Sequence, residues 1–138
     1  WFEKEFPDDI GEPVCELYWA LAHYRAGNID QARVRLQSAM LNNIYMLPFL
    51  FNEPMKEQEI WHGSNWEQPE YLFEIEEFLN EPTVEEREWM RKEFYSKSFE
   101  KLRTGYIETY KALLGELDFQ KRGKILEEWR QYIQRFFD

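Results

Sequence analysis

The chain has 138 residues, of which 43% are hydrophobic and 18% aromatic, and its formal charge is −10. This length suits one domain, and the aromatic content excludes a disordered chain, which would have few aromatic residues. The excess of 27 acidic over 17 basic residues argues against general binding to nucleic-acid phosphates, which needs a basic surface. No window approaches the roughly 18–20 consecutive apolar residues of a membrane span. We therefore expect neither a nucleic-acid nor a membrane partner.

The charge is unevenly distributed along the chain. Residues 1–88 carry a net charge of −13, whereas residues 89–138 carry +3. One interpretation is that these charges lie on solvated helix faces. The other is that the basic end meets an acidic surface, either of a partner or of a second copy of the chain, which would make a homo-oligomer.

Residues with the chemistry of a catalytic or metal centre are scarce. The single cysteine, Cys15, is predicted to be a small buried hydrophobic residue, and the lack of a disulfide fits a reducing, cytoplasmic compartment. The two histidines, His23 and His62, lack the ligand spacing of a metal site, and no nucleophile or phosphate-binding motif occurs. We expect no cofactor, no metal and no enzymatic activity.

Two helices are predicted near the start of the chain. Pro13 is suited to a first helical position, so the first helix should run over 13–26 and stop at Gly27. Asn28 can cap the second helix in a capping box with Gln31. Apolar residues at helical spacing then line one face of that helix up to Met40.

The next segment, over 45–66, is predicted to be an ordered connector because it is rich in proline, asparagine and aromatic residues. A short helix near 54–61 is one option within it. Ser64 can cap a helix over 67–79, whose inner face would carry aromatic and aliphatic residues.

The longest helical pattern follows a proline break. Thr83 and Glu86 form a capping-box pair, and apolar residues then recur every three to five positions over 84–114. Gly105 could kink this helix, and Gly115 should end it. Asp118 can cap a last helix over 118–137. The whole chain, 1–138, is therefore predicted to be one all-α domain.

Residues 13–44 resemble a tetratricopeptide repeat (TPR). Small residues occupy the positions where the two helices of that motif cross, Gly27 occupies the turn, and Leu36 supplies apolar bulk. Glu16 replaces an aromatic residue of the motif, and Ile44 replaces its closing proline. No other segment repeats the hairpin well. The crossing residues are Ala20, Ala32 and Ala39.

Residues 39–79 have a second resemblance, to the tail of suppressor-of-tumorigenicity-7-like proteins and of uncharacterised bacterial repeat proteins. Asn43 to Leu50 and Gly63 to Phe73 carry it. This resemblance implies a segment that caps a helical stack. Together the two resemblances imply a compact right-handed stack or bundle of helices.

Protein–protein interaction is the leading functional hypothesis. In TPR stacks the first helix of each hairpin lines a concave surface that holds a peptide or a partner helix. The same residues could instead pack against the helix at 84–114, and with one good repeat we favour that outcome. An aromatic platform in the connector is a second candidate surface. The candidate residues are Val14, Leu17, Leu21, Tyr24 and Arg25 on the hairpin, and Trp61 and Trp66 in the connector.

An acidic inhibitor or immunity-type protein is the alternative. The net charge of −13 over residues 1–88 would allow the chain to cover a basic partner, and salt should weaken such a complex steeply.

Overall fold

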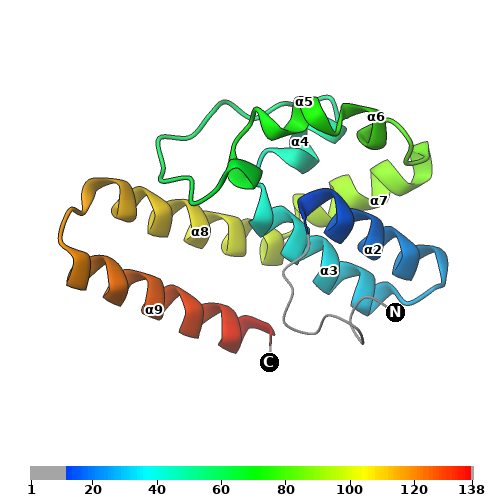
Figure 1. Cartoon of the computed structure of the whole chain (residues 1–138). Coiled ribbons are helices and arrows are strands. Elements are labelled where there is room, and N and C mark those ends of the chain that lie inside the picture. The colour runs from blue at the N-terminus through cyan, green and yellow to red at the C-terminus, as the bar shows by residue number, and fades with distance from the viewer. Residues whose placement is uncertain (1–11, 138) are drawn as a thin grey trace.

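The computed structural model describes residues 12–137, and every regular element in that range is a helix (Figure 1). The prediction of an all-α fold is therefore confirmed for these residues. The elements, in chain order, are α2 (Pro13–Arg25), α3 (Ile29–Asn42), α4 (Met46–Leu50), the short 3-10 helix η1 (Asn65–Glu67), α5 (Tyr71–Glu74), α6 (Glu76–Leu79), α7 (Val84–Phe94), α8 (Lys97–Gly115) and α9 (Phe119–Phe137).

The first two helices form an antiparallel hairpin whose turn depends on Gly27. This glycine has a φ of 84°, and its N–H donates to the carbonyl of Tyr24, while the N–H of Asn28 donates to that of His23. These two bonds make a Schellman motif, in which glycine is favoured because it adopts positive φ without strain. The predicted capping box at Asn28 does not form, because the backbone of Asn28 is held by this motif and its side chain makes no cap bond.

Three small residues let the two helices of the hairpin approach each other. Ala20, Ala32 and Ala39 are all completely buried. A larger side chain at any of them would force the packed helices apart. The two helices predicted near the start of the chain are present as an antiparallel pair.

The predicted connector over 45–66 contains the short helix α4, and buried polar groups fix the part that follows it. Asn43 donates from Nδ2 to the carbonyls of Trp66 and Gln68, at 2.8 and 3.0 Å. The Tyr45 hydroxyl accepts from the N–H of Gln58 and hydrogen-bonds Nε2 of His62. The short helix considered near 54–61 does not form; the N–H of Gln58 donates to the Tyr45 hydroxyl, and that of Ile60 donates to the carbonyl of Gln58.

The prediction of one continuous helix over 67–79 is wrong. The chain forms α5 and α6, which are separated at Ile75, where φ is −114°. Ser64 precedes η1 but makes no side-chain cap bond. The break allows buried residues on both short helices to face the core, since Tyr71, Ile75 and Leu79 are each less than 5% exposed.

The predicted helix over 84–114 is also two helices, with the break at Tyr95 and Ser96. Ser96 ends α7 and begins α8, because its Oγ donates to the carbonyl of Glu93 and accepts from the N–H of Phe99. The capping box of Thr83 and Glu86 at the start of α7 is confirmed. The change of direction lets both Phe94 on α7 and Phe99 on α8 reach the core.

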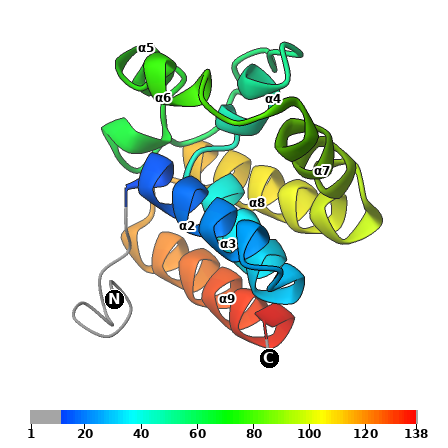
Figure 2. The same ribbon diagram turned by 90° about the vertical axis from the view of Figure 1, so that its right-hand side faces the viewer.

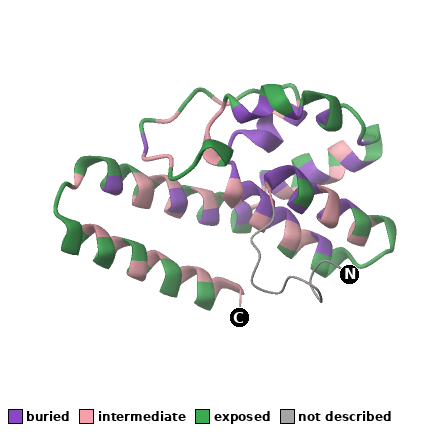
Figure 3. Cartoon of the chain, viewed as in Figure 1, coloured by how far each residue is buried: buried purple, intermediate pink, exposed green. Residues whose placement is uncertain are grey.

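The last helix, α9, packs antiparallel along α8 at the edge of the fold (Figures 1 and 2). Asp118 precedes it and accepts from the N–H of Lys121 at 3.0 Å, as predicted. The core lies among α2, α3, α4, α5, α6, α7 and the first half of α8, whereas no residue of α9 is buried (Figure 3). The apolar face of α9 is therefore only partly covered.

At Gly105, side chains of α9 pack against α8. This glycine does not end α8, which continues to Gly115. A Cβ at position 105 would lie 3.2 Å from Cζ3 of Trp129, whose ring is itself held against Tyr132 and Tyr106. Glycine therefore allows the indole of α9 to pack directly on the backbone of α8.

Two glycine-to-alanine substitutions test this contact. We expect Gly123→Ala, which meets no atom within 4 Å, to raise the free energy of unfolding by about 0.5–1 kcal/mol through helix propensity. Gly105→Ala should lose that gain and shift the fluorescence of Trp129 as α9 moves outward. Urea unfolding and amide exchange of α9 measure both effects. Equal gains from the two variants would show that the contact at Gly105 is unimportant.

Candidate functional site

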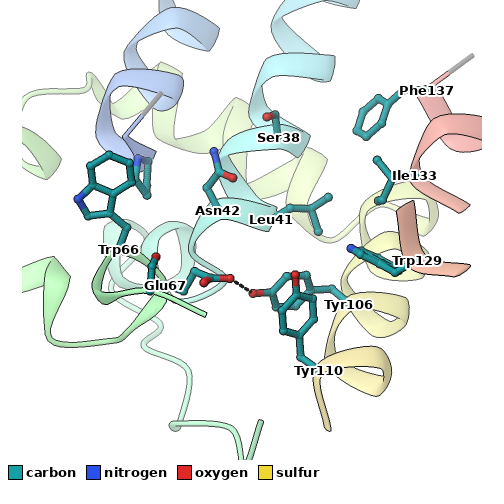
Figure 4. Close-up of a pocket in the computed structure, with 12 residues that line it drawn as sticks. Ser38, Leu41, Asn42, Trp66, Glu67, Tyr106, Tyr110, Trp129, Ile133 and Phe137 are labelled. Atoms are coloured by element: carbon teal, nitrogen blue, oxygen red, sulfur yellow. Dashed lines mark hydrogen bonds between the residues drawn. The ribbon is translucent and has the colours of Figure 1, made fainter. Parts of the chain in front are cut away.

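A pocket of about 550 Å³ lies between α9 and the rest of the molecule (Figure 4). One side is formed by the end of α3 and the segment around η1, and the other by α8 and α9. Its surface is mainly apolar, with a few polar groups at the rim. The lining residues are Pro13, Ser38, Leu41, Asn42, Ser64, Trp66, Glu67, Tyr106, Tyr110, Trp129, Ile133 and Phe137.

Aromatic rings form the wall of the pocket on α8 and α9. Tyr106 and Tyr110 are one helical turn apart and stack with their ring centroids 4.1 Å apart. Trp129 meets Tyr106 edge to face at 6.0 Å. These contacts hold the rings in fixed orientations, and rigid aromatic surfaces bind apolar groups at a low entropic cost.

The opposite wall is positioned by the connector. The side-chain amide of Asn43 holds the carbonyl of Trp66, and the hydroxyl of Tyr106 donates to Oε1 of Glu67 at 2.9 Å. The Tyr106–Glu67 bond ties η1 to α8 across the base of the pocket (Figure 4). The indole of Trp66 is 47% exposed and remains accessible at the rim.

Burial sets the ionisation of the pocket tyrosines. It raises the pKa of Tyr110 to about 12 and raises the pKa of Tyr106 further, with the Glu67 carboxylate adding to both. Both hydroxyls are therefore neutral near pH 7, and Glu67 carries the one carboxyl group among the lining residues. A pocket of this kind suits an apolar or aromatic ligand with few polar groups.

Trp61 does not line the pocket. Its ring stacks on Tyr110 at 5.9 Å, and the guanidinium of Arg122 lies 4.9 Å from the ring centroid. The N–H of Trp61 also donates to the carbonyl of Tyr110 at 3.0 Å. Trp61 therefore anchors the connector to α8, and of the two connector tryptophans Trp66 alone reaches the pocket.

The hairpin face proposed from the TPR resemblance is filled. Leu17 and Leu21 are completely buried and Val14 is 8% exposed, so none of these side chains offers a substantial free surface. Tyr24 stacks on Trp89 of α7 with centroids 4.4 Å apart.

Arg25, the remaining hairpin candidate, pairs with Glu86 on α7. Its Nε and Nη2 atoms donate to the two carboxylate oxygens at 2.6 and 3.1 Å. The open groove therefore does not exist at this end of the hairpin, because α7 occupies it. The sequence analysis favours packing of these residues against the predicted helix over 84–114, and α7 is the first part of that segment.

Two further residues can now be placed. Cys15, predicted to be buried, is exposed on α2. His62 lies in the connector with its Nε2 2.8 Å from the Tyr45 hydroxyl, which explains its presence by packing. Within residues 12–137, no group of three or more His, Cys, Asp or Glu side chains is arranged to hold a metal ion. In the same range no helix is long and apolar enough to cross a membrane.

Sequence reasoning missed most of the pocket. Tyr106 and Tyr110 belong to the apolar positions that recur over 84–114, and Trp129 to the last predicted helix, and the sequence assigns a binding role to none of the three. The signal that could have found the site is the combination of Tyr106 and Tyr110 at i and i+4 with a strongly amphipathic last helix. That pattern shows an aromatic face, but it does not show how completely other elements cover it.

No protein-family model, curated protein or solved structure matches this chain. The TPR-like relationship consequently rests on the residues of the hairpin alone.

Proposed function

We propose that this chain is a non-enzymatic protein-interaction module of TPR-like type, and that the aromatic pocket beside α9 receives apolar side chains of a partner protein. The observation that supports this proposal is the 550 Å³ pocket with stacked tyrosines and an accessible tryptophan at its rim. Tryptophan and tyrosine are enriched where proteins recognise one another.

The position of α9 also supports the proposal. This helix has no buried residue, although one face carries Trp129, Ile133 and Phe136. A helix with an incompletely covered apolar face gains stability when a partner covers it. Burial of further apolar surface at the pocket would therefore be favourable.

The test is affinity capture with a variant that fills the pocket. Ser38 lines the pocket and is only partly exposed, so Ser38→Trp should occupy part of the cavity from the α3 side. We expect this variant to lose partners that the wild-type chain retains. Leu41→Arg, which places a charge in the same wall, provides an independent second variant.

The matched control is Leu117→Arg, because Leu117 is 94% exposed and lies outside the pocket. It should retain every partner. Circular dichroism verifies that each variant is folded. Capture of the same proteins by the wild type, Ser38→Trp and Leu41→Arg would refute the proposal.

A further inference from the structure

Apart from the aromatic pocket, a groove of about 560 Å³ lies between the start of α2 and the short helices α5 and α6. It shares no residue with the aromatic pocket. Its lining combines an apolar floor with an acidic rim. The lining residues are Glu12, Val14, Cys15, Tyr18, Glu74, Ile75, Phe78 and Glu81.

The apolar part of this groove is held in place by Tyr18. The Tyr18 hydroxyl donates to the carbonyl of Phe78 at 2.7 Å and to Oε2 of Glu81 at 3.1 Å. The rings of Tyr18 and Phe78 meet edge to face, with centroids 6.4 Å apart and an interplanar angle of 85°. Phe78 is nevertheless 47% exposed, so part of its ring remains available to a ligand.

Buried residues and the hydrogen bonds of Tyr71 also hold the floor of the groove in place. Val14 and Ile75 are both buried, and the hydroxyl of Tyr71 bridges α5 to the start of α2. It donates to Oε1 of Glu12 at 2.8 Å and accepts from the N–H of Val14 at 3.3 Å. The groove is therefore preformed, and a ligand would not have to pay much conformational entropy to shape it.

The rim is acidic, and Arg25, a described base that interacts electrostatically with Glu81, donates its hydrogen bonds to Glu86 instead. Glu12, Glu74 and Glu81 line the groove, and no described basic side chain forms an ion pair with any of them. Residues 67–88 contain nine acidic residues and one base, Arg87.

Arg87 offsets one of these nine charges but is not paired with a rim carboxylate, because its guanidinium donates to backbone carbonyls at the end of α6 and before α7. The acceptors are the carbonyls of Leu79, Asn80 and Pro82. The groove thus presents an apolar surface inside a region of strong negative potential, which attracts cationic ligands.

We propose that this groove binds a cationic amphipathic segment of a partner protein, with an apolar side chain against Phe78 and lysine or arginine side chains beside Glu74 and Glu81. Charge complementarity selects this occupant: acidic segments and nucleic acid would be repelled, and a free metal ion would leave the apolar floor unused. The proposal concerns a surface separate from the aromatic pocket and stands independently of it.

Binding of a defined peptide to the full chain tests the proposal. The probe is a fluorescent amphipathic helical peptide of leucine and lysine, compared with the same peptide carrying glutamate in place of lysine. We expect saturable binding of the lysine peptide at low salt, at least about tenfold weaker binding at roughly 0.5 M salt, and no binding of the glutamate peptide. Equal binding of both peptides would overturn the proposal.

Variants of equal charge change locate the interaction. Glu74→Lys should weaken binding by about tenfold, whereas Glu128→Lys, an exposed change on α9, should weaken it less than about twofold. Phe78→Ala should weaken binding with little change in its salt dependence, because it removes an apolar contact.

Three results would contradict the assignment. Equal losses in Glu74→Lys and Glu128→Lys would indicate long-range attraction without a site. Loss of peptide binding in Ser38→Trp would place the peptide in the aromatic pocket. A dimer of the chain alone that Glu74→Lys dissociates would assign the groove to a second copy.

Discussion

Replacement of Phe99 by alanine is expected to lower the free energy of unfolding by about 3–5 kcal/mol, the usual cost of deleting a buried aromatic ring. Phe99 is completely buried and belongs to the core shared by α2, α3, α4 and α7. It also follows the Ser96 cap, where α8 begins. Loss of the ring leaves a cavity at the point where α7 and α8 change direction. Urea unfolding followed by circular dichroism measures the loss.

The matched control is Phe119→Ala, which removes the same ring from a site that is 89% exposed. We expect the free energy of unfolding to change by less than about 0.5 kcal/mol, because no packed surface is lost. Similar losses in the two variants would contradict the core described above.

Glu86→Gln is expected to lower the free energy of unfolding by about 1–3 kcal/mol, because a buried carboxylate with several donors loses its charge. Glu86 is 5% exposed. It accepts two bonds from Arg25 of α2 and one, at 3.0 Å, from the N–H of Thr83. Since Arg25 is itself half exposed, solvent weakens the pair, and the expected cost is smaller than that of a fully buried ion pair.

The contribution of Glu86 should also depend on pH. The hydrogen bonds from Arg25 hold the pKa of Glu86 below its ordinary value, while burial opposes this shift. A depressed pKa in the folded state means that the stabilisation is complete above the unfolded pKa, near 4.3, and is lost as the pH falls through the folded value. The difference in stability between the wild type and Glu86→Gln should therefore shrink below about pH 4.

Glu88→Gln provides the control for this pH dependence, because Glu88 is exposed on the same helix. Its stability should follow that of the wild type from pH 7 to acid. A difference between the wild type and Glu86→Gln that stays constant over this range would refute the role assigned to the ion pair.

Both surfaces proposed for binding depend on the packing of elements against one another, which the sequence did not predict. The groove on α2 exists because residues 67–79 break at Ile75, which turns Phe78 toward Tyr18. The aromatic pocket exists because α9 packs on α8 without closing against α3. In both cases the sequence pattern indicates an apolar helix face. Which element packs against that face depends on segments that are distant in the sequence.

The hairpin residues also show that sequence spacing alone does not distinguish a binding face from a core face. Leu17 and Leu21 have the spacing of a TPR binding face, and the same spacing suits a core helix. Burial by other helices decides between these outcomes, and the contacts of Tyr24 and Arg25 identify α7 as one of the covering elements. Periodicity records that a face is apolar and carries no information about what covers it.

The sequence by itself determined the all-helical class, the turn at Gly27, the capping box at Thr83 and the start of the last helix at Asp118, because each depends on residues within one or two turns of one another. Only the tertiary structure decided the breaks at Ile75 and Ser96, the burial of the hairpin face, with α7 against Tyr24 and Arg25, and the presence of the aromatic pocket and the acidic groove. These features depend on which apolar faces meet, and such contacts join residues that are up to about sixty positions apart.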